Sequence, residues 1–461
     1  MTQSTGITIG IDVGTTSIKA HAFTMDGKIV GRASLPTPWN VLVNGQTEID
    51  IDVLADTAIH VMAESVPGSH PHGSVIGLGI TGMAETGVLV DARHRPLMSA
   101  IAWFDERGKN ELQELDLEFA ANFSAHTGLG FKAESSFSKL LWRKRLGADI
   151  PVGSRWLNAL EYIAYRLTGT SVTEPSLASR TGLFDQQTSN PWIPALEQIG
   201  ADTTLIPELH LAGTSIGQVG EFAPAELRGA EVTVAGHDHL VGAVGAGVAG
   251  ANDLYNSCGT ADVVLRSVER VLTNDERTTL VARGLSAGRH VIPAATAILG
   301  ATRSGLVLGR VLAMLGANDR QARRAIADSW DPHNESEVSV SQPQDWTNEV
   351  TISLRGDVSP TDVWASAMAY VLSDTSALVH AADDIAGPHG RATASGGWAQ
   401  IDGVFRGKSQ VMPGLNRFDG EEPGSRGASA LAALAAHHTN VPLTANLAVA
   451  FSTPPQKELV Q

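Results

Sequence analysis

The residues with the clearest chemistry stand near the start of the chain, in the stretch Asp12-Val-Gly14-Thr15-Thr16. Apolar residues alternate with small or polar ones on both sides, which predicts two β-strands joined by a tight turn. Gly14 lets the backbone approach a ligand, and amides with the Thr15 and Thr16 hydroxyls can then face a phosphate. Asp12 would repel that phosphate unless a hard cation such as Mg2+ lies between them. An ordinary hairpin with an exposed aspartate is the alternative interpretation.

A second hairpin of this kind is predicted in residues 253–266. Gly259 and Thr260 repeat the Gly-Thr pair of the first turn, and Ser257 takes the place of the aspartate. Two such hairpins suggest a duplicated domain whose loops face each other across a cleft. The first loop would hold the metal ion, and the second would hold only phosphate. The arrangement resembles the actin-like ATPase superfamily, which includes sugar kinases.

Length and composition limit the class of protein. With 461 residues the chain is too long for one ordinary core, and 43% hydrophobic with 18% charged residues is typical of a globular protein. The net charge of -16 argues against nucleic acid or an anionic membrane as the partner. The single cysteine, Cys258, allows no intramolecular disulfide. No secretory signal is evident, and we expect a cytoplasmic protein.

Two stretches in the first half carry side chains suited to a polyhydroxylated ligand. Glu85 lies between two predicted strands, and Trp103, Asp105 and Arg107 alternate along a segment that we expect to be extended, so that they share one face. An aromatic ring can stack on the C–H face of a sugar while carboxylates accept its hydroxyl groups. A solvated turn at Glu85 and a partly buried tryptophan beside an ion pair are the alternatives.

Residues 232–247 combine an acid with two histidines. They predict a strand up to Ala235, a glycine turn and a helix that begins near Asp238. A helix N-terminus favours negative charge, so Asp238 would stay ionised while it faces the cleft. His237, Asp238 and His239 could also be taken for a metal cluster. Two histidines separated by one residue lack the i, i+4 spacing of a helical zinc pair, so the pattern does not favour zinc.

The elements that must position these residues can be read from apolar spacing. Residues 51–66 have helical spacing, and a long core helix is predicted after Ser359-Pro-Thr-Asp362, which combines a cap, a proline and an acid. A strand over residues 391–394 leads into Ser395-Gly396-Gly397, where a glycine pair permits a flat ring to lie against the backbone. An alanine-rich closing helix is predicted over residues 427–436.

Taken in order, these motifs resemble the FGGY carbohydrate kinases, which transfer the terminal phosphate of ATP to a hydroxyl of a sugar or polyol. The resemblance covers almost the whole chain, from Ile7 to about Ala436. It departs from the family pattern at Arg143, where an apolar residue is usual. The motifs that carry it, besides the two Gly-Thr loops, are Trp103-x-Asp105-x-Arg107, Ser136-x-x-Lys139-Leu140-x-Trp142 and residues 156–185.

The resemblance implies an α/β fold of two ribonuclease-H-like domains that flank a central cleft. Residues 1–245 would form the N-terminal sugar-binding and catalytic domain, and residues 246–461 the C-terminal nucleotide-binding domain. Asp238 matches the family's catalytic base, which would accept the proton of the attacking hydroxyl, and Gly396-Gly397 matches the adenine-binding loop. Mg2+ would be positioned by Asp12 and Asp238.

The expected site comprises two sets of residues. Those expected to contact ATP are Asp12, Gly14, Thr15, Thr16, Gly259, Thr260, Gly300, Gly396 and Gly397. Those expected to contact the sugar are Ala84, Glu85, Trp103, Asp105, Asp238 and His239.

The substrate is specified less closely. Glycerol kinases resemble this chain at Glu85-Thr86 but carry an arginine where Ala84 stands, and xylulose kinases usually have Met-His at positions 84 and 85. Because Glu85 and Asp105 would repel an acid, we expect a neutral ketose or polyol of about four to six carbons, with a pentulose such as xylulose first. A four-carbon substrate or glycerol is the alternative within the family. An actin-like ATPase and a sugar-sensing pseudokinase are alternatives from other classes, and a homodimer is one candidate assembly.

Overall fold

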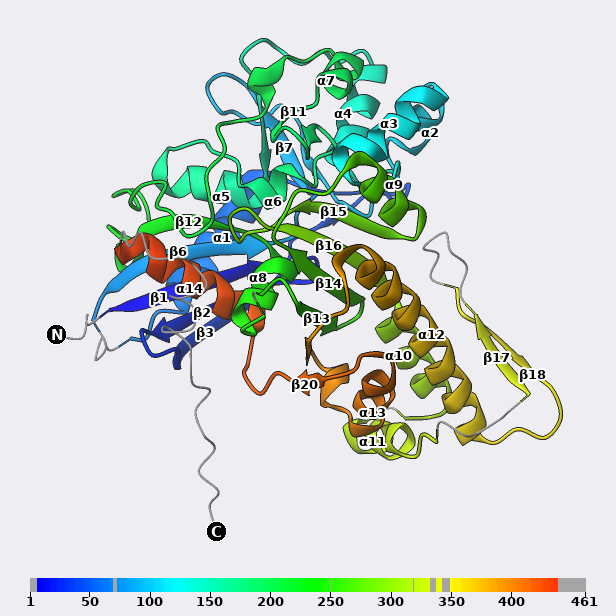
Figure 1. Ribbon diagram of the computed structural model, residues 1–461. Coiled ribbons are helices and arrows are strands. Elements are labelled where there is room, and N and C mark those ends of the chain that lie inside the picture. The colour runs from blue at the N-terminus through cyan, green and yellow to red at the C-terminus, as the bar shows by residue number, and fades with distance from the viewer. Residues whose placement is uncertain are drawn as a thin grey trace.

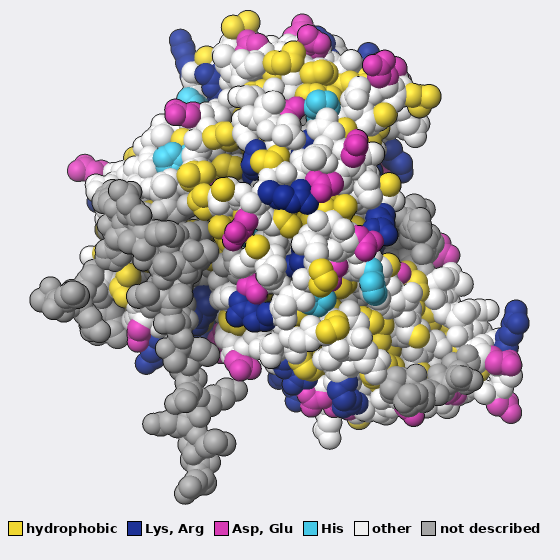
Figure 2. All heavy atoms as spheres, in the orientation of Figure 1, with side chains coloured by type: hydrophobic (Ala, Val, Ile, Leu, Met, Phe, Trp, Pro, Cys, Tyr) yellow, Lys and Arg dark blue, Asp and Glu magenta, His cyan; other side chains and the backbone are white. Residues whose placement is uncertain are grey.

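The computed structural model describes residues 6–68, 73–248, 250–317, 319–331, 337–341 and 349–437. Its two largest sheets each contain one of the predicted Gly-Thr hairpins, and helix α8 (Asp238–Gly245) contacts strands of both sheets (Figure 1). Acidic and basic side chains are interspersed over the face drawn in Figure 2 rather than gathered by sign. None of the helices in these ranges is both long and apolar enough to span a lipid bilayer.

The first sheet has five strands in the order β12-β6-β1-β2-β3. Strand β1 pairs antiparallel with β2 and parallel with β6, which in turn pairs parallel with β12. The predicted hairpin is therefore confirmed, β3 pairs antiparallel with β2 beside it, and Ile7, Ile9 and Ile11 are buried as their alternation predicts. The strands are β1 (Ile7–Val13), β2 (Ser17–Thr24), β3 (Ile29–Pro36), β6 (Val75–Gly82) and β12 (Glu231–His237).

The second sheet has six strands in the order β15-β16-β14-β13-β19-β20. Strand β13 pairs antiparallel with β14 and parallel with β19, so the second hairpin repeats the surroundings of the first. This repeat confirms the predicted duplicated α/β fold. The strands are β13 (Asp253–Cys258), β14 (Asp262–Val268), β15 (Leu285–Arg289), β16 (Thr296–Thr302), β19 (Arg391–Ser395) and β20 (Leu415–Arg417).

The predicted helices are present with small shifts at their ends. Helix α1 (Ile51–Glu64) packs against the first sheet, and α12 (Pro360–Ala386) packs against β14 and β16 of the second. The expected start of α12 is confirmed, since the side chains of Ser359 and Asp362 form a reciprocal capping box. The other helices used below are α5 (Ala159–Thr168), α6 (Pro175–Ala178), α9 (Asn274–Ala282), α10 (Ser304–Met314) and α13 (Asp402–Val411).

A helical region with its own apolar core extends from the first half of the chain, at the top of Figure 1. Its helix α3 packs against α9, so the two halves touch there as well as near α8. The helices of this region are α2 (Lys109–Gln113), α3 (Leu117–Thr127), α4 (Ser136–Arg145) and α7 (Ile193–Ile199). Helix α11 (Arg320–Asp328) packs against α13. Four small sheets complete the described fold, and their strands are β4 (Asn40–Val41), β5 (Thr47–Ile49), β7 (Gly87–Val90), β8 (Ala100–Ile101), β9 (Arg155–Asn158), β10 (Phe184–Asp185), β11 (Asn190–Pro191), β17 (Val338–Ser341) and β18 (Thr351–Leu354).

The closing helix α14 (Pro423–His437) begins four residues before its predicted start at 427, and it covers the first sheet rather than the second. It packs on β1, β6 and β12 and crosses α8. Glycines make this approach possible, because a Cβ at Gly10 would lie 1.8 Å from the carbonyl oxygen of Ser425, and one at Gly79 would lie 1.9 Å from that of Ala428. The domain boundary at residue 245 stays a prediction, since a helix from the C-terminal half completes the N-terminal layer.

We predict that Gly79→Ala destabilises the protein, because the added methyl group has no room between β6 and α14. Overpacking of this kind typically costs about 1–3 kcal/mol of the free energy of unfolding. Chemical denaturation of the variant and the wild type would measure the difference. Gly68→Ala is the matched control, since a Cβ there meets nothing within 4 Å. Equal stability of Gly79→Ala and the control would contradict the proposed contact.

Candidate active site

A cavity of about 420 Å³ opens between the two sheets. Six residues predicted from the sequence line it, and the second sheet contributes the opposite wall through β14, β15 and β16. The structure therefore brings together side chains that are far apart in the sequence, although their roles in binding stay predictions. The six residues are Thr15, Ala84, Glu85, Trp103, Asp238 and His239.

The side chains of Thr37 and Trp39 anchor the first Gly-Thr loop through two of its carbonyl oxygens. The carbonyl oxygens of Gly14 and Thr15 accept hydrogen bonds from the Thr37 hydroxyl (2.7 Å) and from the Trp39 indole (2.7 Å). In a trans peptide the amide N–H points opposite to the carbonyl that precedes it. The amides of Thr15 and Thr16 are therefore directed away from this anchoring segment, as an anion-binding loop requires.

Trp103 is fixed against the same loop, because its indole Nε1 donates a hydrogen bond of 3.0 Å to the Thr15 hydroxyl. Its backbone amide donates to the hydroxyl of Thr86 over 3.1 Å. The ring thus joins the predicted phosphate loop to the predicted sugar pocket through one direct contact. Nothing in the local sequence pattern indicates this link.

Asp12 and Asp238 lie at the ends of strands β1 and β12 and interact electrostatically. Burial, followed by the charge of Asp238, raises the pKa of Asp12 to about 7. The pKa of Asp238 is also raised to about 7, by burial first and by the nearby charge of Glu85. Asp12 Oδ1 is buried and has no hydrogen-bond partner in the described part of the chain. Two such carboxylates fit the oxygen ligands that Mg2+ prefers.

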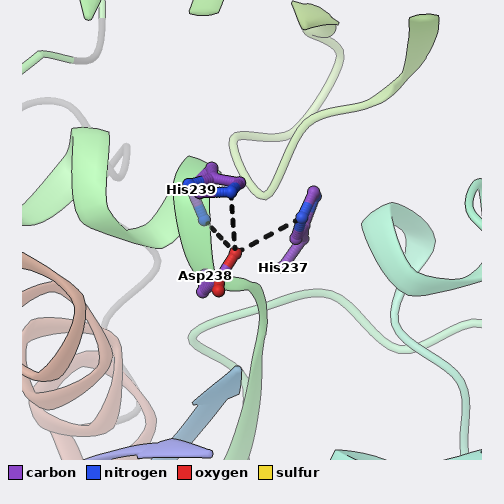
Figure 3. A group of neighbouring side chains, drawn as sticks. All are labelled: His237, Asp238 and His239. Atoms are coloured by element: carbon purple, nitrogen blue, oxygen red, sulfur yellow. Dashed lines mark hydrogen bonds and ion pairs between the residues drawn. The ribbon is translucent and has the colours of Figure 1, made fainter. Parts of the chain in front are cut away.

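Asp238 is the first residue of α8, as predicted, but strand β12 continues to His237 rather than ending at Ala235. The Asp238 carboxylate accepts a hydrogen bond from the His239 backbone amide over 2.6 Å (Figure 3). Burial lowers the pKa of His239 to about 4 and holds that of His237 well below its ordinary value. Both imidazoles are therefore neutral near pH 7.

Glu85 has a partner that the sequence analysis missed. Arg180, just after α6, donates from Nε to Glu85 Oε1 over 2.7 Å and from Nη1 to the Ser286 hydroxyl over 2.7 Å. Residues 156–185 carry part of the family resemblance, but nothing in their spacing indicates that Arg180 is the partner of Glu85. Because Arg180 neutralises Glu85, the charge of Glu85 is a weaker reason to exclude an acidic substrate than expected.

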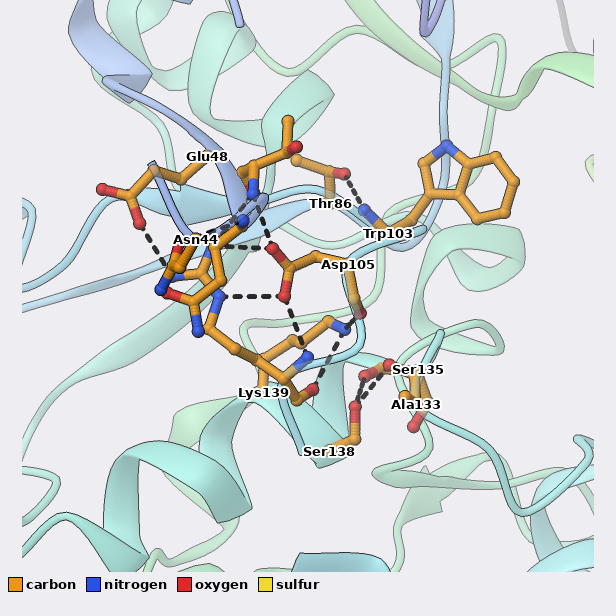
Figure 4. Close-up of polar contacts among 12 residues, drawn as sticks. Asn44, Glu48, Thr86, Trp103, Asp105, Ala133, Ser135, Ser138 and Lys139 are labelled. Carbon is orange, nitrogen blue, oxygen red and sulfur yellow. Dashed lines mark hydrogen bonds and ion pairs between the residues drawn. The ribbon is translucent and has the colours of Figure 1, made fainter. Parts of the chain in front are cut away.

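The expected contact between Asp105 and a sugar stays a prediction, and the structure gives this side chain other partners. The segment around it is a turn rather than an extended strand, and only Ala100 and Ile101 are in a strand. The Asp105 side chain is 2% exposed and accepts hydrogen bonds from the Thr47 amide (2.7 Å) and from Arg107 Nε (2.9 Å). Figure 4 shows its carboxylate directed away from the indole of Trp103.

Asp105 instead helps to hold the turn that carries Trp103. Lys139 of α4 is buried and donates to the backbone oxygens of Asp105 and Arg107. Burial lowers its pKa to about 8. The motif Trp103-x-Asp105-x-Arg107, which carries part of the family resemblance, therefore serves partly to stabilise this turn.

The second Gly-Thr loop and the glycine pair after β19 lie against each other. A Cβ at Gly396, where φ is +91°, would lie 2.5 Å from the Cys258 carbonyl oxygen. A Cβ at Gly305, at the start of α10, would lie 1.9 Å from the carbonyl oxygen of Gly259. A Cβ at Gly397 would meet nothing within 4 Å, so the space beside this glycine is open.

Gly300 differs from this set, and its expected contact with the nucleotide stays a prediction. Its neighbours Leu299 and Ala301 line the cavity, and the alternation of a strand turns residue 300 to the other face. A Cβ there would lie 2.9 Å from a methyl carbon of Leu378 on α12. Gly300 therefore packs against a core helix.

A buried polar cluster lies beneath the second loop. Asp262, just after the loop, forms an ion pair with Lys408 of α13 and accepts a hydrogen bond from the Thr375 hydroxyl over 3.1 Å. Asn256 donates to the other oxygen of Asp262 over 2.7 Å. Burial raises the pKa of the neighbouring Cys258 to about 12, so this cysteine is an unreactive thiol in the folded protein.

Comparison with known proteins identifies the family to which the chain belongs. Residues 7–245 match the FGGY family of carbohydrate kinases, N-terminal domain. A xylulose kinase from Staphylococcus xylosus is 25% identical over 56% of this chain and 54% of its own length. A glycerol kinase from Thermococcus kodakarensis is 26% identical over 60% of this chain and 57% of its own length. The chain thus spans about half the length of the curated relatives it matches.

Solved structures are similar over a greater length. The xylulose kinase from Rhodospirillum rubrum aligns with a TM-score of 0.81 and 22% identity, and covers 96% of this chain and 92% of its own. The ligand-bound xylulose kinase from Lactobacillus acidophilus aligns with a TM-score of 0.83 and 17% identity, over 96% and 91%. At these identities the likeness establishes the fold.

We predict that Asp12 makes the stability of the metal-free protein depend on pH. Its pKa rises from an ordinary 3.8 to about 7 on folding. Between about pH 4 and pH 7 the unfolded chain loses a proton that the folded protein keeps, so the free energy of unfolding falls as pH rises. Asp12→Asn removes this effect, and its melting temperature relative to wild type should be higher at pH 8 than at pH 5.

Magnesium supplies the second half of this test. At pH 8, adding MgCl2 should raise the melting temperature of the wild type more than that of Asp12→Asn, because the cation neutralises the ionised carboxylates. Glu226→Gln, at an exposed position far from the cavity, is the control. An Asp12→Asn protein that follows the wild type at both pH values would contradict the raised pKa.

Proposed function

Because the chain belongs to the FGGY family of carbohydrate kinases, we propose that it transfers the terminal phosphate of ATP to a hydroxyl group of a small neutral sugar or polyol. The observation that carries this proposal is the pair Asp12 and Asp238, two partly buried carboxylates at the ends of β1 and β12, beside a cavity lined by Glu85 and Trp103. The first Gly-Thr loop reaches the same cavity through Thr15. A donor site and an acceptor site would therefore adjoin the same carboxylates.

In this proposal the sugar lies against Trp103, with its hydroxyls bonded to Glu85 and to His239. Arg180 fixes the direction of the Glu85 carboxylate, since it holds one of the two oxygens. A carboxylate with a fixed direction discriminates between hydroxyl arrangements better than a mobile one. Ala84 leaves space beside Glu85 because it has no long side chain.

Asp238 accepts the proton of the attacking hydroxyl. A base is most effective when its pKa lies near the working pH, and in the metal-free protein burial raises the pKa of Asp238 to about 7. Mg2+ bound by Asp12 and Asp238 would neutralise charge on the phosphates. The amides of the two Gly-Thr loops would hold the phosphate chain, and the adenine would lie beside Gly396 and Gly397.

The substrate class rests on the pocket and on the relatives. A neutral pentulose such as xylulose comes first, because xylulose kinases are among the relatives and the Arg180 guanidinium is already engaged by Glu85 and Ser286. A four-carbon polyol or ketose, or glycerol, is the alternative, and the similarity to glycerol kinases favours it. A cytoplasmic location, a homodimer and the division into residues 1–245 and 246–461 stay part of the proposal.

The proposal predicts that Asp238→Asn lowers turnover by about two to four orders of magnitude, because an amide cannot accept the proton. ADP release from MgATP would be measured across ketopentoses, ketohexoses, tetritols and glycerol. One sugar should raise the rate far above the background of the wild type. Binding of ATP to the variant should change little, and Glu226→Gln should behave as the wild type.

Three results would overturn this proposal or parts of it. Full turnover by Asp238→Asn would remove Asp238 as the base. If no sugar stimulates ADP release although sugars raise the melting temperature, the protein binds sugar without phosphorylating it. Hydrolysis of ATP that depends on assembly instead of sugar would favour the actin-like ATPase.

A further inference from the structure

His237, Asp238 and His239 form a compact cluster on the wall of the cavity. Asp238 Oδ1 lies 3.3 Å from His237 Nε2 and 3.8 Å from His239 Nε2. One ligand atom from each of the three residues lies within 4.8 Å of the other two (Figure 3). Neither Nε2 atom has another hydrogen-bond or ion-pair partner among the described residues. The cluster therefore has donor atoms that are not otherwise used.

The backbone conformation explains how two histidines only two residues apart can bring their rings together, although this spacing argued against a helical zinc pair. The objection applied to two histidines on one helix, where neighbours two apart face different sides. Here His237 is the last residue of β12, with extended dihedrals of -63° and 129°, and α8 begins one residue later. The chain changes direction between the two histidines. Both side chains consequently face the Asp238 carboxylate.

We propose that His237, Asp238 and His239 bind one divalent cation of the zinc class, and that this cation blocks the proton-accepting function of Asp238. Two imidazoles and one carboxylate are a ligand set that zinc prefers, whereas magnesium prefers oxygen ligands alone. This difference in preferred ligands distinguishes the proposed zinc site from the magnesium site at Asp12 and Asp238, although both sites use the Asp238 carboxylate. Magnesium would bind between the carboxylates of Asp12 and Asp238, and zinc would bind between the Asp238 carboxylate and the two imidazoles.

The position of the cluster determines what bound zinc does. All three residues line the cavity, so three protein ligands leave a fourth coordination position open toward it. The lone pair that Asp238 would use to accept a proton is then donated to the cation. This inhibitory part rests on the proposed kinase function. The binding of zinc does not, because it depends only on the three donor groups.

Equilibrium dialysis of untagged, chelator-treated protein against zinc chloride, followed by metal analysis, tests the site directly. We expect one zinc ion per chain to depend on this cluster. His237→Gln and His239→Gln should each weaken its binding by at least about tenfold, since each removes one of three protein ligands. His60→Gln, at an exposed position on α1, is the matched control and should bind as the wild type. Thermal denaturation would establish that each variant is folded.

The outcomes separate the two parts of the proposal. No bound zinc at micromolar concentration, or zinc that both variants retain with full affinity, overturns the site. If zinc binds here, it should reduce sugar-dependent ADP release in excess MgATP, and a chelator should restore the rate. Unchanged turnover by zinc-loaded protein overturns the inhibitory part. If no sugar supports turnover at all, the kinase proposal fails while the dialysis result still decides the metal site.

Discussion

The contact between α14 and the glycine-lined strands of the first sheet is the constraint on which the site depends. Backbone meets backbone there, since Gly10, Gly79 and Gly427 leave no room for a Cβ. Gly10 stands two residues before Asp12, and Gly427 packs against the carbonyl of Val241 in the first turn of α8, the helix that Asp238 begins. One helix therefore fixes the strand that carries the first carboxylate and the helix that carries the second. A pair of carboxylates can share a cation only if both supports are held in this way.

Charge in the cavity is balanced locally. The chain carries a formal charge of -16, and both Asp12 and Asp238 hold their protons more tightly than ordinary aspartates. A cation at these carboxylates removes the cost of keeping two buried negative charges side by side. The Arg180 guanidinium forms its ion pair with Glu85, although its charge also lowers the pKa of Asp238. The arrangement thus leaves the carboxylates near β1 and β12 available for a cation.

The sequence predicted strands and helix starts, because these depend on residues that are close together along the chain. The alternation at Ile7, Ile9 and Ile11 gave the first strand, and the same reasoning found the second hairpin and the start of α8. It failed where the partner is distant in sequence. Asp105 is bonded to Thr47, and Arg180 to Ser286, and no spacing rule indicates either pair. The packing of Gly300 against α12 could not be predicted either, because a glycine can serve a ligand or a close helix and only the direction it faces distinguishes the two.

Arg180 connects the orientation of the Glu85 carboxylate to the position of the second sheet. The same guanidinium holds Glu85 and the hydroxyl of Ser286 on β15. If the halves of the molecule separate, the bond to Ser286 is lost and the arginine is free to turn with its carboxylate. Ligand affinity and opening of the cleft are then linked quantities, so that whatever draws the halves together also prepares the pocket, and by reciprocity an occupied pocket favours the closed form.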